Sequence, residues 1–345
     1  MGKGTIRVGF VGAGGNTRAK HIPGFQAQDG VEVVSVCNRS HESSERVAKE
    51  FGIPTVYDNW RELVEADDTD AICIGTWPYM HYPVTLAALE AGKHVLCEAR
   101  MAMDAAEAQE MLAASRAEPH LITQVVPAPQ TLHVDCTIQD LIADGYCGNL
   151  LAVELRSGNG FVDCDGPMTW RQDVGLSGFN TLWVGLWYEV LIRWVGEATK
   201  VAAMAKVFVK DRKDESGVRR AVQVPDHVDI LADMACGAQA HLVFSAVRGL
   251  AGEEEVWLYG SEGTLQLRGP EYTLHGGRRG DSTLDEIPIS PEKSMSWRVE
   301  EEFVGAIRGE EMVVHTSFED GVKYMDFTEA VVRAAQTGET IPLPL

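Results

Sequence analysis

The stretch Thr5-Ile6-Arg7-Val8-Gly9-Phe10-Val11-Gly12-Ala13-Gly14-Gly15 decides how the chain begins to fold. Its apolar first part predicts a short buried strand, and the glycines after it predict a tight turn. A second apolar run, Val31 to Val36, follows at the distance expected for a strand–helix–strand unit. Such a unit holds a dinucleotide, because the glycines let a pyrophosphate approach the backbone and the helix points its N-terminal amides at the phosphates.

The glycine pattern is incomplete, since Thr17 stands at the third glycine position. An ordinary strand-to-helix turn is therefore the alternative interpretation. The placement of the glycines favours the nucleotide site, because they follow a strand, open the chain and precede a second strand.

The end of the second predicted strand indicates which dinucleotide is bound. An acidic residue there would accept hydrogen bonds from a free ribose 2′-hydroxyl and repel a 2′-phosphate. This chain has Asn38, Arg39 and Ser40 instead, and a guanidinium is a good partner for a phosphate. The sequence predicts NADP as the preferred cofactor, with NAD as the alternative.

Composition and charge exclude several kinds of partner. The chain has 345 residues and a formal net charge of −21, which repels nucleic acid and anionic membranes. No apolar run reaches the roughly 18 residues of a membrane span. Short acidic clusters at 253–255 and 300–302 are interpreted as solvated faces.

The cysteines and the N-terminus indicate the compartment. The seven cysteines are odd in number and show no paired metal spacing, so we expect reduced thiols in a cytoplasmic protein. The first strand begins at about Thr5, which leaves no room for a signal peptide.

The pattern along the chain predicts two domains. Residues 1–125 alternate strands and helices, which is typical of a parallel sheet with its ligand crevice at the carboxyl ends of the strands. Residues 126–345 contain successive alternating strands, which predict an open-faced, mainly antiparallel sheet with helices near 134–143, 180–194, 300–308 and 320–335. Residues 212–216 and 276–282 are expected to be exposed loops. The fold class is thus α/β followed by α+β.

Longer motifs give the chain a family resemblance. Thr76-Trp77-Pro78 with His81, Ala88-Leu89-Glu90-Ala91-Gly92-Lys93-His94-Val95-Leu96-Cys97-Glu98, Gly260-Ser261-Glu262-Gly263-Thr264-Leu265 and Glu319-Asp320-Gly321 are its main elements. With the glycine turn and Trp170-Arg171, they resemble the glucose–fructose oxidoreductase, inositol dehydrogenase and rhizopine-catabolism (Gfo/Idh/MocA) family over nearly the whole length.

The resemblance implies a Rossmann domain, a substrate domain and oxidation or reduction of a hydroxyl on a sugar, cyclitol or similar compound with NAD or NADP. It also implies a homo-oligomer, a dimer or tetramer, formed through the C-terminal sheet. The cofactor contacts that it suggests, together with the neighbours of these residues, are Gly12, Gly14, Asn16, Thr17, Asn38, Arg39, Ser40, Thr76, Trp77, Pro78, His81, Glu98, Trp170 and Arg171. His81 and Trp170 also have a simpler interpretation, as packing residues.

The chain departs from the family pattern where the proton is normally handled. The usual Glu-Lys-Pro reads Glu98-Ala99-Arg100, and alanine transfers no proton. The family pattern also has an Asp, a His four residues later and then a further Asp on one helix. This chain has Trp183, Trp187 and Val190 at those positions. Spacings of four and seven place these three on one helical face. The resulting aromatic stripe is either core packing or a wall that stacks on a ring-shaped substrate.

Three residues remain candidates for the chemistry, namely Arg100, Tyr188 and Asp173. Arg100 stays charged and can stabilise an alkoxide or hold an anion, while Tyr188 or Asp173 can exchange the proton. Glu189 precedes Arg193 by four residues, which favours a surface ion pair over catalysis. Asp163 and Asp165 have no further ligands nearby, so no metal site is predicted.

These inferences predict an NADP-dependent oxidoreductase acting on a small, cyclic hydroxyl or carbonyl compound. The nicotinamide is expected between the Rossmann strand ends and the helix that carries Trp183 and Trp187. Two alternatives remain open, namely a redox-neutral lyase or glycosidase with tightly bound cofactor, and a non-catalytic sensor that binds NADP.

Overall fold

The computed structural model describes residues 4–181 and 183–345, and these residues form two compact units. The first unit contains residues up to Pro127 together with Arg298–Val322, and the second contains Ala128–Trp297 and Lys323–Leu345. Residues 298–322, which belong to the C-terminal half of the sequence, therefore pack with the N-terminal unit. Leu182, which falls in the helix predicted near 180–194, lies outside the described residues.

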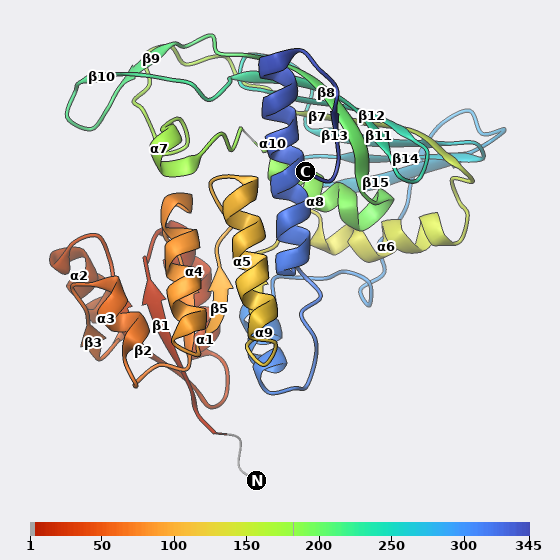
Figure 1. Cartoon of the computed structure of the whole chain (residues 1–345). Helices are drawn as coiled ribbons and strands as arrows, with labels where there is room; N and C mark the ends of the chain where they lie inside the picture. The colour runs from red at the N-terminus through yellow and green to blue at the C-terminus, as the bar shows by residue number, and fades with distance from the viewer. Residues whose placement is uncertain (1–3, 182) are drawn as a thin grey trace. The chain divides into compact units, whose positions relative to one another are not determined.

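The first unit is built on a six-stranded parallel sheet in the order β3-β2-β1-β4-β5-β6 (Figure 1). Its strands are β1 (Ile6–Val11), β2 (Val31–Cys37), β3 (Thr55–Val56), β4 (Ala71–Ile74), β5 (His94–Cys97) and β6 (Thr123–Val125). β1 and β4 are almost wholly buried, as expected for central parallel strands covered on both faces. The parallel sheet predicted from the sequence is confirmed.

Short helical segments connect these strands, and capping residues mark several of their ends. They are η1 (Thr17–His21), α1 (Ile22–Gln26), α2 (His41–Phe51), α3 (Trp60–Glu65), η2 (Pro78–Met80), α4 (His81–Glu90) and α5 (Ala105–Ala117). Ser40 caps α2 by accepting from the Ser43 N–H, and Asp104 caps α5 by accepting from the Glu107 N–H. Gly52 ends α2 with a φ of 70°.

The late segment of the first unit attaches to the last strand of the sheet. It contains α9 (Val299–Ile307) and the beginning of α10 (Phe318–Thr337). The Val125 N–H donates to the Thr316 carbonyl at 2.9 Å, and the Gln124 side chain donates to Glu302 at 3.2 Å. These contacts add a C-terminal helix to the N-terminal sheet.

The second unit contains a nine-stranded mixed sheet in the order β16-β15-β14-β13-β7-β12-β11-β8-β17. The strands are β7 (Leu150–Ser157), β8 (Ala198–Lys206), β11 (His227–Met234), β12 (Gln239–Ser245), β13 (Glu255–Gly260), β14 (Gly263–Arg268), β15 (Thr273–Arg278), β16 (Asp285–Glu286) and β17 (Ile341–Pro342). β7 and β12 run parallel, and the other neighbours are antiparallel. The mainly antiparallel sheet is confirmed.

One face of this sheet is lined by α6 (Leu132–Ala143), α8 (Val184–Val195) and most of α10, whereas the short α7 (Val174–Ser177) lies apart from it (Figure 1). The strand β11 shows the two faces, because Val228 and Ile230 are buried while Leu231 is exposed. The two segments expected to be exposed loops are partly strands. β9 (Asp211–Lys213) pairs with β10 (Arg219–Ala221), and β15 reaches Arg278, because backbone pairing overrides the polar composition of both segments.

Candidate functional site

The glycine turn at the end of β1 leaves room for a ligand against the backbone. Gly12 has a φ of +84°, and a Cβ there would lie 2.6 Å from Cγ2 of Thr76 and 2.8 Å from its backbone nitrogen. Only glycine fits this position. Nothing lies within 4 Å of the position that a Cβ of Gly15 would take, so the next part of the turn is open. Thr76 Oγ1 is buried and has no hydrogen-bond partner in the described chain.

The end of β2 is fixed to the glycine turn by Asn38. Its Oδ1 accepts from the Ala13 N–H at 2.7 Å, and its Nδ2 donates to the carbonyl and hydroxyl of Ser43 at 3.2 Å. Asn38 is thus occupied in joining the turn to α2. Arg39 is exposed, and its guanidinium carbon lies 5.5 Å from the ring centroid of Trp77. It forms no ion pair among residues 4–181 and 183–345.

The loop after β4 is tied to the loop after β5 by His81. This buried imidazole lies 3.1 Å from the Thr76 carbonyl and 2.8 Å from the Arg100 carbonyl. Burial lowers the pKa of His81 below its usual value, although the two backbone hydrogen bonds oppose this effect. Pro78, at the start of η2, is also buried. These two residues shape the loop that presents Thr76 and Trp77.

A chain of polar contacts lies at the end of β5. The side-chain Nδ2 of Asn16 donates to Glu98 Oε1 at 2.5 Å, and His21 Nε2 lies 3.0 Å from the same oxygen. On its other side, His21 Nδ1 lies 2.5 Å from Oε1 of Glu300, which belongs to α9. Thr17, the first residue of η1, is also buried. The sequence indicated Glu98 and Asn16 but gave no signal for the histidine or for Glu300.

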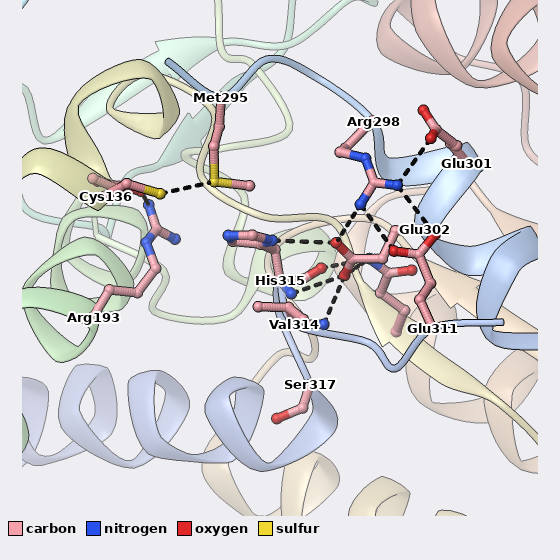
Figure 2. Close-up of polar contacts among 12 residues, drawn as sticks. Cys136, Arg193, Met295, Arg298, Glu301, Glu302, Glu311, Val314, His315 and Ser317 are labelled. Atoms are coloured by element: carbon pink, nitrogen blue, oxygen red, sulfur yellow. Dashed lines mark hydrogen bonds and ion pairs between the residues drawn. The ribbon is translucent and has the colours of Figure 1, made fainter. Parts of the chain in front are cut away.

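The sequence predicted that the acidic cluster 300–302 on α9 is a solvated face. This prediction is wrong, because Glu300 and Glu302 are only 4% and 2% exposed. Glu302 accepts from the backbone N–H groups of Val314 and His315 at 2.8 Å, as Figure 2 shows. Glu301, which is exposed, accepts from Arg298 at 2.9 Å (Figure 2). Three successive glutamates therefore have three different environments.

Arg100 follows the Glu98 network and is 5% exposed. Its carbonyl is held by His81, so the backbone at this position is fixed. A guanidinium keeps its charge when buried, because its intrinsic pKa is very high. Arg100 therefore supplies a permanent cation beside the strand ends of the first unit.

In the second unit, Trp170, Arg171 and Trp183 form one cluster. The Arg171 guanidinium carbon lies 4.3 Å from the Trp170 ring centroid and 6.0 Å from that of Trp183. Burial lowers the pKa of Arg171, which still remains a cation. Trp183 stands at the N-terminal end of α8 and is 47% exposed. The cluster therefore presents an indole face and a cation to solvent.

The other members of the aromatic stripe on α8 are core residues. Trp187 is 2% exposed, and its Nε1 donates to Glu254 at 3.0 Å. Trp194, which extends the stripe by a further turn and more, donates to Asp135 at 2.8 Å. Shape and hydrogen bonding thus favour packing over a substrate wall for these two, and Trp183 alone of the stripe keeps an accessible ring.

Tyr188 is also buried, and its ring stacks on Phe327 with the centroids 3.7 Å apart. Its hydroxyl accepts from the Ala198 N–H at 2.7 Å, and burial raises the pKa of Tyr188 above its usual range. This environment disfavours proton exchange with a substrate. Its packing supports the core interpretation of the residue.

Two further acidic candidates have defined partners. Asp173 caps α7, since its Oδ1 accepts from the Gly175 N–H at 2.9 Å, and the residue is half-buried. Glu189 pairs with Arg193 at 2.5 Å, as the spacing predicted, but the pair is buried rather than on the surface. Glu189 also accepts from the Ala128 N–H, which fixes it as a structural residue.

No group of three His, Cys, Asp or Glu that could hold a metal occurs in residues 4–181 and 183–345. Among the same residues, no helix is both long and apolar enough to cross a membrane. Asp163, considered above as a ligand, accepts instead from the backbone of Asp165 and Gly166.

Comparison with known proteins agrees with this arrangement. Residues 6–125 match the oxidoreductase family Gfo/Idh/MocA, NAD-binding Rossmann fold, and residues 136–266 match the C-terminal domain of the same family. The chain belongs to the Gfo/Idh/MocA oxidoreductase family. This membership confirms the resemblance seen in the sequence, and it identifies the first unit as a Rossmann domain that binds NAD(P).

Individual relatives are distant. A trans-1,2-dihydrobenzene-1,2-diol dehydrogenase from Oryctolagus cuniculus is 27% identical over 268 residues, covering 76% of this chain and 75% of that protein. A 1,5-anhydro-D-fructose reductase from Ensifer adhaerens is 35% identical over 149 residues, covering 43% and 44%. The solved structure of levoglucosan dehydrogenase in complex with NADH and L-sorbose has a TM-score of 0.86 at 20% identity, with 99% of both chains covered. An NAD binding oxidoreductase from Klebsiella pneumoniae has the same TM-score at 22% identity, also with 99% of each chain covered.

Proposed function

We propose that this protein is an NADP-dependent oxidoreductase that acts on a hydroxyl or carbonyl group of a small cyclic compound. The cofactor supplies one chemical property, which is that C4 of its nicotinamide accepts or donates hydride. The observation that carries the NADP preference is the exposed Arg39 at the end of β2, with no acidic side chain beside it in the Asn38-Arg39-Ser40 segment.

The glycine turn fits the pyrophosphate of such a cofactor. Gly12 lets the pyrophosphate approach the backbone closely. The buried Thr76 Oγ1 lacks a hydrogen-bond partner in the described chain, and a bound ligand could supply one. Arg39 and Ser40 would hold the 2′-phosphate, while Trp77 supports the Arg39 guanidinium by stacking. The side chain of Asn38 is already occupied in joining the turn to α2.

The substrate class follows from the accessible aromatic surface of the second unit. The Trp183 ring would stack on the apolar face of a ring-shaped substrate. Trp170 and Arg171 would contact the cofactor, as the family resemblance implies. The names of two relatives are consistent with a cyclic substrate, since one is a dihydrobenzene-diol dehydrogenase and the other an anhydrofructose reductase.

In the oxidative direction, the substrate hydroxyl loses its proton and the carbon that carries it loses hydride. Arg100 would stabilise the developing alkoxide by its fixed positive charge. Asp173 would accept the proton, because its Oδ2 is left over when Oδ1 caps α7. Tyr188 receives no role here, because its hydroxyl is buried and accepts from Ala198. In the reductive direction, both transfers reverse.

We also propose that the open face of the nine-stranded sheet joins copies of the chain into a homo-oligomer. Met204 and Leu231, on the neighbouring strands β8 and β11, are 78% and 51% exposed. By strand register, Trp257 lies on the same face. Leu231→Lys should then shift the protein toward a monomer in analytical ultracentrifugation. An unchanged mass for the variant would argue against this face.

The test of the function is turnover of cyclic polyols, sugars and ketones with NADP or NADPH, followed by the near-ultraviolet absorbance of the reduced nicotinamide. Net turnover supports the oxidoreductase. Product formation without net change of a tightly held cofactor would indicate a redox-neutral lyase or glycosidase. A non-catalytic sensor is the second candidate, because the buried Tyr188 and Trp187 leave few groups for chemistry. NADP binding with no turnover of any substrate would favour it.

Cofactor preference is tested by Arg39→Ala. Loss of a charge-assisted phosphate contact should weaken NADP binding by about 1.5–3 kcal/mol, roughly 10- to 150-fold in Kd, with little effect on NAD. Arg61→Ala is the matched control, because Arg61 also lies over an indole, that of Trp60, at 4.4 Å. Equal effects of Arg39→Ala on both coenzymes would refute the NADP assignment.

A further inference from the structure

Three ionisable side chains meet in the interior of the first unit, and segments far apart in the sequence supply them. His21 is 0% exposed and lies at the end of η1, Glu98 follows β5, and Glu300 belongs to α9. Imidazole Nδ1 is 2.5 Å from Glu300, and Nε2 is 3.0 Å from Glu98. We call these residues the Glu–His–Glu triad.

The contacts fix the charge of the triad. Each ring nitrogen faces a carboxylate oxygen at hydrogen-bond distance, so each nitrogen needs a proton to avoid repulsion between lone pairs. Burial opposes a charged imidazole, but the hydrogen bonds to Glu300 and Glu98 outweigh it and raise the pKa of His21 to about 9. With one proton in each of its two contacts, the triad carries a net charge of −1 at neutral pH.

The exposed end of the triad is the Glu98 carboxylate, whose side chain is 15% exposed. Its Oε1 also accepts from Asn16, and its Oε2 accepts from the Ala99 N–H at 3.2 Å. Glu98 therefore stands at the carboxyl end of β5, beside the segment that follows the glycine turn. In a Rossmann sheet, ligands lie outside the carboxyl ends of the strands.

An ionised carboxylate in this position distinguishes the two redox states of a nicotinamide, because the oxidised ring is a cation and the reduced ring is neutral. We propose that His21 and Glu300 are positioning residues that hold Glu98 as a fixed carboxylate and so favour binding of NADP⁺ over NADPH. This inference rests on the proposed function, because it requires a nicotinamide cofactor beside Glu98.

The test is the ratio of the Kd of NADPH to the Kd of NADP⁺, measured by calorimetry at pH 7.5 for wild type and Glu300→Gln. The substitution keeps the size of the side chain and changes the triad charge from −1 to 0, wherever the remaining proton resides. The ratio should fall about three- to tenfold, the effect of one charge at roughly 10 Å in a medium of intermediate dielectric. An unchanged ratio would overturn the proposal.

Two neighbours on α9 provide matched controls. Glu301→Gln removes an exposed carboxylate that pairs with Arg298, and Glu302→Gln removes a buried carboxylate that holds the 314–315 backbone (Figure 2). Among residues 4–181 and 183–345, the side chains of Glu301 and Glu302 pair with groups other than His21 and Glu98, so both variants should keep the wild-type ratio. A fall in the ratio for Glu302→Gln equal to that of Glu300→Gln would show a general effect of destabilisation and overturn the proposal.

Adenosine 2′,5′-bisphosphate separates this proposal from the proposed function. The fragment lacks the nicotinamide, so its Kd should be the same for wild type and Glu300→Gln. If wild type binds neither the fragment nor NADP⁺, the proposed function fails. If wild type binds both and Glu300→Gln leaves the redox ratio unchanged, only the role of the triad fails.

A measurement on wild type keeps the proposal testable if Glu300→Gln does not fold. Deprotonation of His21 makes the triad more negative, so the ratio should rise severalfold between pH 7.5 and pH 10. Cys73 and Cys97 are also affected by the charge of Glu98. They stay neutral over this interval because burial raises the pKa of each well above its usual value. A ratio that is constant or falls over this interval would overturn the proposal.

Discussion

The buried His21 predicts that the first unit loses stability in alkaline solution. Although burial opposes a charged ring, the hydrogen bonds that His21 donates to two carboxylates raise its pKa from 6.5 to about 9. A raised pKa stabilises the folded state fully below the unfolded value of 6.5, and this contribution is lost as the pH rises through about 9. The shift corresponds to on the order of 3 kcal/mol of unfolding free energy.

Substitution Glu300→Gln reduces this pH dependence, because it removes one of the two carboxylates that hold the imidazolium. The free energy of unfolding of the variant should be lower than that of wild type at pH 6.5, and it should decline less between pH 6.5 and pH 9.5. Hydrogen exchange of peptides from β1 and η1 under increasing denaturant measures the first unit by itself. Glu302→Gln is the control, because it removes a buried carboxylate of the same helix and leaves His21 paired.

The opposite pH limit involves another member of the triad. Although burial opposes ionisation, the hydrogen bond from His21 and its neighbours lowers the pKa of Glu98. Its contribution is therefore lost in acid. Burial raises the pKa of Cys37, Cys73 and Cys97 from 9.0, so these thiols also reduce stability near pH 9.5, but equally in wild type and variant. The difference between wild type and variant from pH 6.5 to 9.5 therefore isolates the histidine. If Glu300→Gln declines as steeply as wild type over that interval, the assignment of a buried imidazolium is wrong.

Three substitutions test the geometry of the turn and of α8. Gly12→Ala should destabilise the first unit by about 1–3 kcal/mol, since φ is +84° and the added Cβ meets Thr76. It should also abolish coenzyme binding in calorimetry, and normal binding by this variant would contradict the turn geometry. Trp187→Ala should lower the free energy of unfolding of the second unit by about 3–5 kcal/mol, measured by chemical denaturation, because the side chain is buried. Trp183→Ala should change stability by less than about 0.5 kcal/mol and raise the KM for a cyclic substrate, and an unchanged KM would remove this residue from the proposed substrate site.

Local signals in the sequence were sufficient for the Rossmann unit. Gly12, Ser40, Gly52 and Asp104 act within their own turn or helix end, so a few neighbouring residues determine the conformation there. The apolar runs of β1 and β2 predicted buried strands of a parallel sheet for the same reason. Such features depend on backbone conformation and burial, which a short segment already specifies.

Contacts between distant segments could not be predicted. His21 and Glu300 are 279 positions apart, and nothing in an acidic run on α9 indicates that two of its members are buried. The partner of each glutamate depends on which face of α9 meets the sheet, and helical periodicity alone does not identify that neighbour.

Periodicity also failed to separate the members of the aromatic stripe. Trp183 and Trp187 share a helical face, but the first stands at the helix end and is exposed, whereas the second is enclosed and bonded to Glu254. A face is buried only where another element covers it. The position along α8, rather than the spacing, therefore decides which indole is accessible.

The measurement that tests the central claim most directly is a calorimetric titration of the wild-type protein with NADP⁺ and with NAD⁺ under the same conditions. Binding of both coenzymes, with NADP⁺ roughly tenfold or more tighter, is the result expected from the Gly12 turn and from Arg39. Tighter binding of NAD⁺ would contradict the role of Arg39, and absence of heat with either coenzyme would contradict the cofactor site itself.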